Sequence, residues 1–201
     1  MAATMENENE KTTKIAIISD LHVMAPELLV KDGKAFQEYL NRDRKMLRES
    51  LEILQTLVAD ILELGPQLVL VTGDLTKDGE RVSHDLVAEQ LQRLVDAGIK
   101  VLVVPGNHDI NNPDARYYDG DDSTPATTIT RNEFAEIYRN MGYDNRSRRD
   151  PDTLSYCRDV TPDLTILAID ACMDRLNTFV SRGDARDHCK TGGSLEVSTQ
   201  Q

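Results

Sequence analysis

The sequence predicts a single α/β domain built on a parallel sheet, and three observations support this class. Short apolar runs rich in β-branched residues are typical of parallel strands buried on both faces: 15–19, 68–72 and 101–105. Amphipathic stretches separate these runs, as in right-handed strand–helix–strand units. A polar cluster directly follows each run: Asp20-Leu21-His22, Gly73-Asp74 and Gly106-Asn107-His108-Asp109. Open α/β sheets place their sites at the carboxyl ends of strands, so the clusters are expected to converge at one edge.

Two helices are expected between the strands. The first has apolar residues at steps of three and four, which is typical of a helix covering a sheet face: Leu47, Leu51, Leu54, Val58, Ile61 and Leu62. Gly65-Pro66 is a C-terminal stop signal for this helix. The second helix ends at Gly98 and carries another apolar set: Val82, Leu86, Leu91, Leu94 and Val95.

The chain after Asp109 has a looser pattern. Residues 111–128 are polar, contain two prolines and predict an irregular insertion at the rim of the site. Thr130 and Glu133 form the pattern of a capping box, which opens a short helix closed by Gly142. Two further apolar stretches predict an antiparallel second sheet: 154–160 and 164–170.

Composition limits the classes of partner. The chain has 201 residues, enough for one domain with a sizeable core, and a formal net charge of −12. Because no dense basic stretch offsets this charge, binding to nucleic-acid polymers is not expected. Its three cysteines, Cys157, Cys172 and Cys189, show no CxxC spacing and indicate neither a disulfide framework nor a zinc knuckle.

The sequence contains no transmembrane segment, because no run approaches the roughly 20 apolar residues that a membrane span needs. Residues 1–13 form a polar tail without the apolar core of a signal peptide. We therefore expect a cytoplasmic protein by default, or a secreted or periplasmic one if a signal peptide has been removed. Residues 14–201 are expected to be the N-terminal portion of a domain truncated at its C-terminus. The final four residues, 198–201, have the form of a capping box that opens a helix, although a short tail could end this way by accident.

The residue types in the three clusters are those of a mixed oxygen and nitrogen metal site. Asp20 and His22 can offer a carboxylate oxygen and an imidazole nitrogen to one ion, and Asp74 could bridge two ions. The amide oxygen of Asn107 is a neutral ligand for the second ion. This set suits divalent Mn, Fe or Zn better than Ca or Mg. His108 lies beside a ligand and is placed to act as a general acid that protonates a leaving alkoxide.

These clusters, in this order and each after a strand, resemble those of the calcineurin-like metallophosphoesterase superfamily. The resemblance covers residues from about 14 to 170. It implies a four-layer α/β/β/α sandwich and a dinuclear hydrolase of small phosphoesters. It places Asp20 and His22 on the first metal, Asp74 between the two metals and Asn107 on the second. It makes His108 catalytic without being a ligand.

The chain departs from this family pattern in its histidines. The family completes its site with later histidines, one isolated and two in a Gly-His-x-His motif, which this sequence lacks. Of the two remaining histidines, His84 is expected at the surface of the second helix and His188 in a charged loop. Neither is expected to replace the missing ligands. An alternative to an active hydrolase is therefore a truncated, catalytically weak or inactive chain that keeps the fold and part of the metal site.

The second departure concerns the branch of the family. Protein Ser/Thr phosphatases carry Gly-Asp-x-x-Asp-Arg-Gly and Gly-Asn-His-Glu, whereas this chain has Gly73-Asp74-Leu75-Thr76-Lys77-Asp78-Gly79 and Gly106-Asn107-His108-Asp109. The pattern is more similar to the cyclic-nucleotide phosphodiesterase and small-phosphoester branch. On this interpretation Asp78 is a loop residue rather than a partner of His108. Nucleotide-binding folds are disfavoured, since both the P-loop and the G-x-G-x-x-G patterns are absent.

Overall fold

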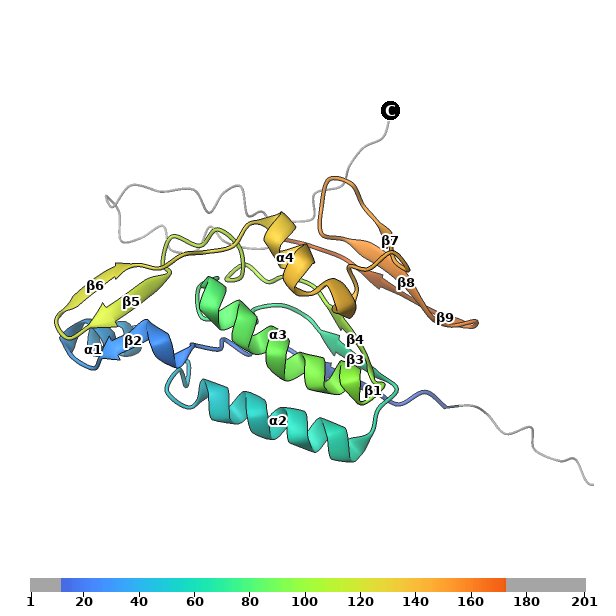
Figure 1. Ribbon diagram of the computed structural model, residues 1–201, viewed down its shortest axis with the longest axis horizontal. Helices are drawn as coiled ribbons and strands as arrows, with labels where there is room; N and C mark the ends of the chain where they lie inside the picture. The colour runs from blue at the N-terminus through green and yellow to red at the C-terminus, as the bar shows by residue number, and fades with distance from the viewer. Residues whose placement is uncertain (1–11, 173–201) are drawn as a thin grey trace, which may run out of the picture.

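A parallel sheet of three strands in the order β1-β3-β4 forms the centre of the computed structural model, which describes residues 12–172. The strands are Ile15–Ile18 (β1), Leu68–Val71 (β3) and Lys100–Val103 (β4). Ile15 pairs with Leu68, and Leu68 pairs with Lys100, so all three strands end at the same edge (Figure 1). The α/β class and the three strands predicted from the sequence are confirmed.

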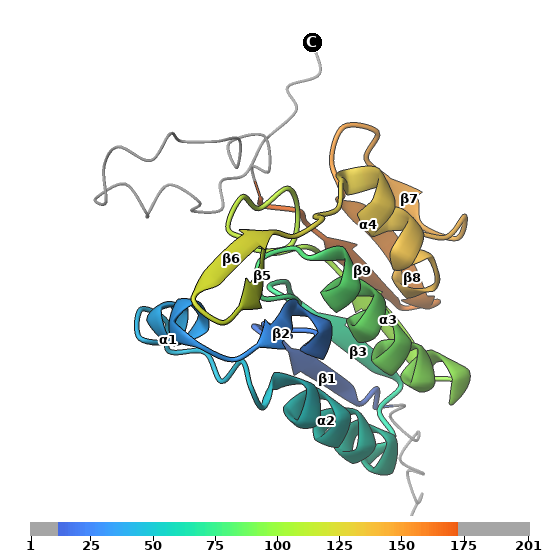
Figure 2. The same ribbon diagram turned by 60° about the vertical axis from the view of Figure 1, so that its left-hand side comes forward.

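Helices α2 (Ser50–Leu64) and α3 (Arg81–Asp96) lie side by side against this sheet (Figure 2). Gly65 ends α2 in the left-handed conformation, with φ of 57°, and its N–H donates to the carbonyl of Ile61. The predicted stop signal is therefore confirmed. Leu47, the first member of the predicted stripe, is buried but lies before the helix begins.

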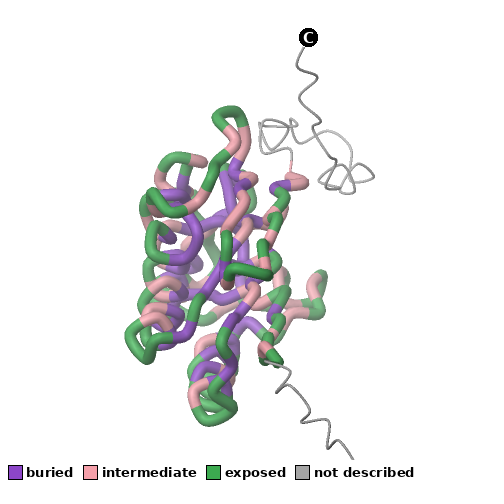
Figure 3. The backbone as a smooth tube through the Cα atoms, turned by 90° about the vertical axis from the view of Figure 1, so that its right-hand side faces the viewer, coloured by how far each residue is buried: buried purple, intermediate pink, exposed green. Residues whose placement is uncertain are grey.

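A second, antiparallel sheet lies beside β4 and consists of β7 (Arg148–Arg149), β8 (Tyr156–Thr161) and β9 (Leu164–Ala168). The Tyr156 hydroxyl donates to the carbonyl of Val103 at 3.0 Å, which joins this sheet to the central one. Helix α4 (Arg131–Ile137) begins with the predicted capping box, and the short 3₁₀ helix η2 (Arg139–Met141) follows it. Figure 3 shows that the buried segments run through the middle of the molecule.

The prediction of an irregular insertion at 111–128 is wrong, because this stretch contains a hairpin of β5 (Arg116–Asp119) and β6 (Asp122–Pro125). The hairpin joins β2 (Leu29–Lys31), which follows the 3₁₀ helix η1 (Pro26–Leu28), and α1 (Lys34–Leu40) packs on it. We call these five elements the accessory layer. Its core gathers six buried residues: Met24, Ala25, Leu28, Phe36, Leu47 and Tyr118. Hydrophobic patterning does not reveal these strands, because β6 is exposed along its whole length and three of its four residues are polar.

The predicted surface position of His84 is also wrong, because its side chain is fully buried. His84 Nε2 donates to the Asp109 carbonyl at 2.7 Å, and Nδ1 accepts from the Tyr138 hydroxyl at 2.9 Å. Both ring nitrogens are thus satisfied by a neutral imidazole. His84 thereby connects α3 and the segment after α4 to the loop that follows β4, a link that helical periodicity does not reveal.

Among residues 12–172, no helix is both long and apolar enough to cross a membrane. The features predicted nearer the C-terminus, namely His188, Cys189 and the pattern at 198–201, lie outside the described residues.

Acid should destabilise the protein through His84. Burial lowers the pKa of His84 from 6.5 to about 3, so the unfolded chain takes up a proton that the folded chain does not. The stabilisation is therefore complete above pH 6.5 and is lost as the pH falls. Between pH 7 and pH 5 it should decrease by about 2 kcal/mol.

His84→Gln provides the comparison, because its amide can still donate to the Asp109 carbonyl but does not titrate. Urea unfolding at pH 7 and pH 5 should show a smaller loss of unfolding free energy in this variant than in the wild type. An equal pH dependence in both proteins would contradict a buried neutral imidazole at this position.

Candidate metal centre

The loops after β1 and β3 are held together by backbone hydrogen bonds that continue the pairing of these strands. The N–H groups of Asp20 and His22 donate to the carbonyls of Gly73 and Asp74, at 3.2 and 2.9 Å. The loop after β4 joins them, since the His108 N–H donates to Asp74 Oδ1 at 3.0 Å. The polar clusters that the sequence places after three separate strands therefore meet at one edge of the sheet.

Three of the four predicted metal ligands have left-handed backbones, which side chains other than glycine seldom adopt. The φ angles are 56° at Asp20, 43° at His22 and 52° at Asp74. Such conformations cost of order 1–3 kcal/mol each and occur mainly at functional sites. The cross-loop hydrogen bonds hold these residues in place, and the strained backbone turns their side chains toward the sheet edge.

Gly106 is required by the close approach of two loops. A Cβ atom at this position would lie 2.1 Å from Asp74 Oδ1 and 2.2 Å from the Asp74 nitrogen. No side chain fits in that space. The role of Gly106 is therefore to leave room for the Asp74 carboxylate and backbone.

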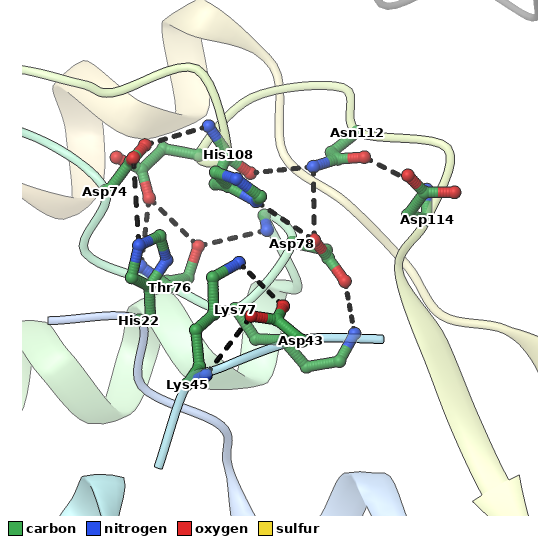
Figure 4. A network of polar contacts seen from close by, with 12 residues as sticks. His22, Asp43, Lys45, Asp74, Thr76, Lys77, Asp78, His108, Asn112 and Asp114 are labelled. Carbon is green, nitrogen blue, oxygen red and sulfur yellow. Dashed lines mark hydrogen bonds and ion pairs between the residues drawn. The ribbon is translucent and has the colours of Figure 1, made fainter. Parts of the chain in front are cut away.

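The side chains at this edge form a compact donor cluster (Figure 4). Donor atoms of His22, Asp74 and His108 all lie within 4.8 Å of one another. His22 Nε2 is 3.8 Å from Asp74 Oδ2 and 3.9 Å from Asp20 Oδ1. These separations exceed a hydrogen bond, but they fit two ligands of one ion, since bonds of 2.0–2.2 Å allow donors to lie up to about 4 Å apart.

The chemistry of these donors therefore fits a divalent metal ion. His22 Nδ1 is buried and has no hydrogen-bond partner among residues 12–172. Burial and the nearby Lys45 ammonium lower the pKa of His22, which favours the neutral imidazole that binds metals. The two carboxylates supply the oxygen donors.

The predicted ligands differ in how closely they approach this cluster. His22 and Asp74 are within it, with 14% and 17% of their side chains exposed. Asp20 lies at its edge with 68% exposed and accepts a hydrogen bond from the Ser19 hydroxyl. Asn107 lies half-buried in the loop between Gly106 and His108. The ligand roles of these four residues remain predictions.

Asp78 pairs with His108, which contradicts its interpretation as a loop residue without this partner. His108 Nδ1 donates to Asp78 Oδ1 at 3.0 Å, and Asp78 is almost fully buried (Figure 4). Burial alone would raise the pKa of Asp78, but hydrogen bonds from His108 and Lys77 outweigh it and hold the pKa at about 2. Burial likewise opposes protonation of His108, yet the hydrogen bond to Asp78 raises its pKa above the ordinary value.

Asp109 connects the loops after β3 and β4 through its carboxylate, a role that the sequence did not indicate. Its buried carboxylate accepts hydrogen bonds from the N–H groups of Gly106, Leu75 and Thr76 and from the Thr76 hydroxyl, at 2.7–3.2 Å. These donors come from the loops after both β3 and β4. Asp109 therefore fixes the separation of Asp74 from His108 without facing the donor cluster.

Gly106→Ala should weaken metal binding, because its methyl group would displace the Asp74 carboxylate. We expect purified Gly106→Ala to contain clearly less Mn, Fe or Zn than the wild type, as measured by elemental analysis after equal metal exposure. Gly98→Ala is the matched control, since Gly98 also has a positive φ, of 84°, but open space around it. That control should lose about 1 kcal/mol of stability, because a Cβ is disfavoured at a positive φ, and should keep its metal. Equal metal contents in the two variants would contradict this role of Gly106.

The similarity of the chain to known proteins identifies its family. A search of curated proteins finds no match. Among solved structures, the chain is similar to a dimetal phosphatase from Danio rerio at 24% identity and a TM-score of 0.34, over 48% of this chain and 29% of that one. The match thus spans less than a third of the length of the Danio rerio chain. The model of the calcineurin-like phosphoesterases matches residues 13–193, and the chain belongs to that family.

Proposed function

We propose that this chain hydrolyses small phosphoesters, either diesters or monoesters, at a dinuclear centre of Mn, Fe or Zn. The observation that carries the proposal is the cluster of donor atoms from His22, Asp74 and His108 at the end of the parallel strands. Membership of the calcineurin-like phosphoesterase family supports the same reaction class.

In this proposal Asp20 and His22 would hold the first ion, Asp74 would be shared by the two ions and Asn107 would hold the second. Bound divalent ions supply a Lewis acid for a phosphoryl oxygen and a nucleophile near neutral pH. The hydrogen bonds that Asp74 and Asp109 accept hold the loops after β3 and β4 in a fixed position relative to each other. A phosphoester would bind over the ends of β1, β3 and β4, where these side chains face outward.

His108 is proposed to donate a proton to the leaving oxygen. Asp78 accepts the Nδ1 proton, which leaves Nε2 as the nitrogen that can transfer a proton to the substrate. The raised pKa of His108 favours the protonated ring at the start of the reaction. The buried, ionised Asp78 keeps the ring orientation constant while that proton is transferred.

The two carboxylates should differ in their importance for metal binding. Asp74→Asn should lower bound Mn, Fe or Zn more than Asp20→Asn, because a bridging carboxylate serves two ions and Asp20 is largely exposed. Elemental analysis of the purified variants tests this expectation. Asp122→Asn, at an exposed position of β6, should keep the wild-type content. Equal losses in the two variants would argue against the bridge, and a metal-free wild type would contradict the metal centre.

His108→Ala should lower kcat by roughly 10²–10⁴ while leaving the metal content close to that of the wild type. The loss should be larger for esters of alkyl or nucleoside alcohols than for p-nitrophenyl esters, because p-nitrophenolate hardly needs protonation. Steady-state rates on bis-p-nitrophenyl phosphate, p-nitrophenyl phosphate and an alkyl diester provide the measurement.

Two results would redirect the proposal. Loss of metal in His108→Ala would show that His108 is a ligand, as its place in the donor cluster also allows. A metal-loaded wild type that hydrolyses none of these esters would support the alternative of a chain that binds metal without turnover.

A further inference from the structure

A buried group of charges lies behind His108, outside the residues proposed to hold metal. Lys77 and Glu80 are fully buried, and Asp78 is 1% exposed. The Lys77 ammonium pairs with Asp78 and, at 3.2 Å, with Glu80 Oε1. Removing charges from water is costly, and replacement of such groups by apolar residues is often neutral or stabilising. Their presence here therefore calls for a role other than stability.

The Asp78 carboxylate connects this group to His108 because its two oxygens serve opposite sides. Oδ1 accepts from His108 Nδ1 at 3.0 Å, with Asn112 Nδ2 at 3.4 Å. Oδ2 accepts from the Tyr39 hydroxyl at 2.9 Å and from the Lys77 ammonium. The direction in which the carboxylate presents Oδ1 to the imidazole is thus set by the groups that hold Oδ2.

Tyr39 belongs to α1 in the accessory layer, far in sequence from Asp78. Its ring also lies 4.3 Å from the Lys77 ammonium, and it contacts the ring of Tyr118 at 5.8 Å. One side chain therefore stacks on the buried cation and hydrogen-bonds the buried anion. Loss of its hydroxyl alone would remove the hydrogen bond to Asp78 and leave the ring packing unchanged.

We propose that Tyr39 is a positioning residue for phosphoester hydrolysis, acting through Asp78 to aim the His108 ring at the leaving oxygen. Through Tyr39, helix α1 of the accessory layer thereby helps to position the proton donor. This inference rests on the function proposed above, in which His108 donates the proton. It identifies α1 as the element that sets the orientation of that donor.

The chain offers a matched pair of variants for the test. Tyr39→Phe removes the hydroxyl that bonds Asp78. Tyr118→Phe removes a buried hydroxyl of the same aromatic cluster that has no hydrogen-bond partner within residues 12–172. Any general effect of losing a buried hydroxyl is common to the two variants, whereas Tyr39→Phe removes a hydrogen bond to Asp78 and Tyr118→Phe does not.

For an alkyl phosphodiester, Tyr39→Phe should lower kcat by about 10–150-fold, the range expected for one hydrogen bond to a charged group, with KM close to the wild-type value. For bis-p-nitrophenyl phosphate the decrease should be less than about threefold, because little proton transfer is needed. Tyr118→Phe should match the wild type on both substrates. A merely structural defect in Tyr39→Phe would instead lower both rates by the same factor.

A second measurement is independent of turnover. In the proton NMR spectrum of histidine-labelled protein, the His108 Nδ1 proton, held by a carboxylate, should give a downfield signal that is absent from Asp78→Asn. The signal should persist in Tyr118→Phe and should weaken or shift in Tyr39→Phe. An unchanged signal in Tyr39→Phe would overturn the positioning role even if the protein hydrolysed no ester.

The outcomes separate this inference from the proposed function. If His108→Ala shows no preference between leaving groups, the proposed proton donor is wrong. If His108→Ala shows the preference and Tyr39→Phe behaves like Tyr118→Phe, the positioning role of Tyr39 alone is overturned. A leaving-group preference shared by His108→Ala and Tyr39→Phe, with a changed Nδ1 signal, supports both.

Discussion

The carboxylate of Asp109 is the interaction on which the arrangement of the site depends. It accepts hydrogen bonds from the loops after β3 and β4, through Thr76, Leu75 and Gly106, while its own carbonyl is held by His84. A buried carboxylate with these donors cannot shift without leaving several polar groups unpaired, each at a cost of about 1–3 kcal/mol. Both Asp74 and His108 are therefore held on a rigid base.

At this edge of the sheet, residues with a strained backbone are held in place by hydrogen bonds between the loops. Asp20, His22 and Asp74 have backbones that cost energy, and they are tolerated because hydrogen bonds between the loops determine their conformations. The strained residues are those whose side chains form or border the donor cluster. Stability is thus lost at the positions where the proposed chemistry needs a particular direction of the side chain.

Hydrogen bonds from surrounding side chains also fix the buried charges behind His108. Asp78 stays ionised in a buried place because Lys77, Tyr39 and His108 all donate to it. Its negative charge fixes which nitrogen of His108 carries a proton toward the interior. An ion pair of this kind adds little net stability, but it selects one arrangement of the side chains around it.

Sequence patterns were enough to locate the central strands, helices α2, α3 and α4 and the polar clusters, because strand and helix periods, the glycine at position 65 and the capping box at Thr130 are local signals. They also predicted that the clusters meet, since parallel strands end at a common edge. Tertiary structure alone decided the burial of His84, the pairing of Asp78 with His108 and the hairpin of β5 and β6. His84 and Asp78 each have a partner distant in the chain, and the neighbours of a residue in sequence do not indicate which distant side chain will lie within hydrogen-bond reach. The hairpin itself is local, but its strand β6 is exposed and β5 pairs with the distant β2, so no hydrophobic pattern marks it.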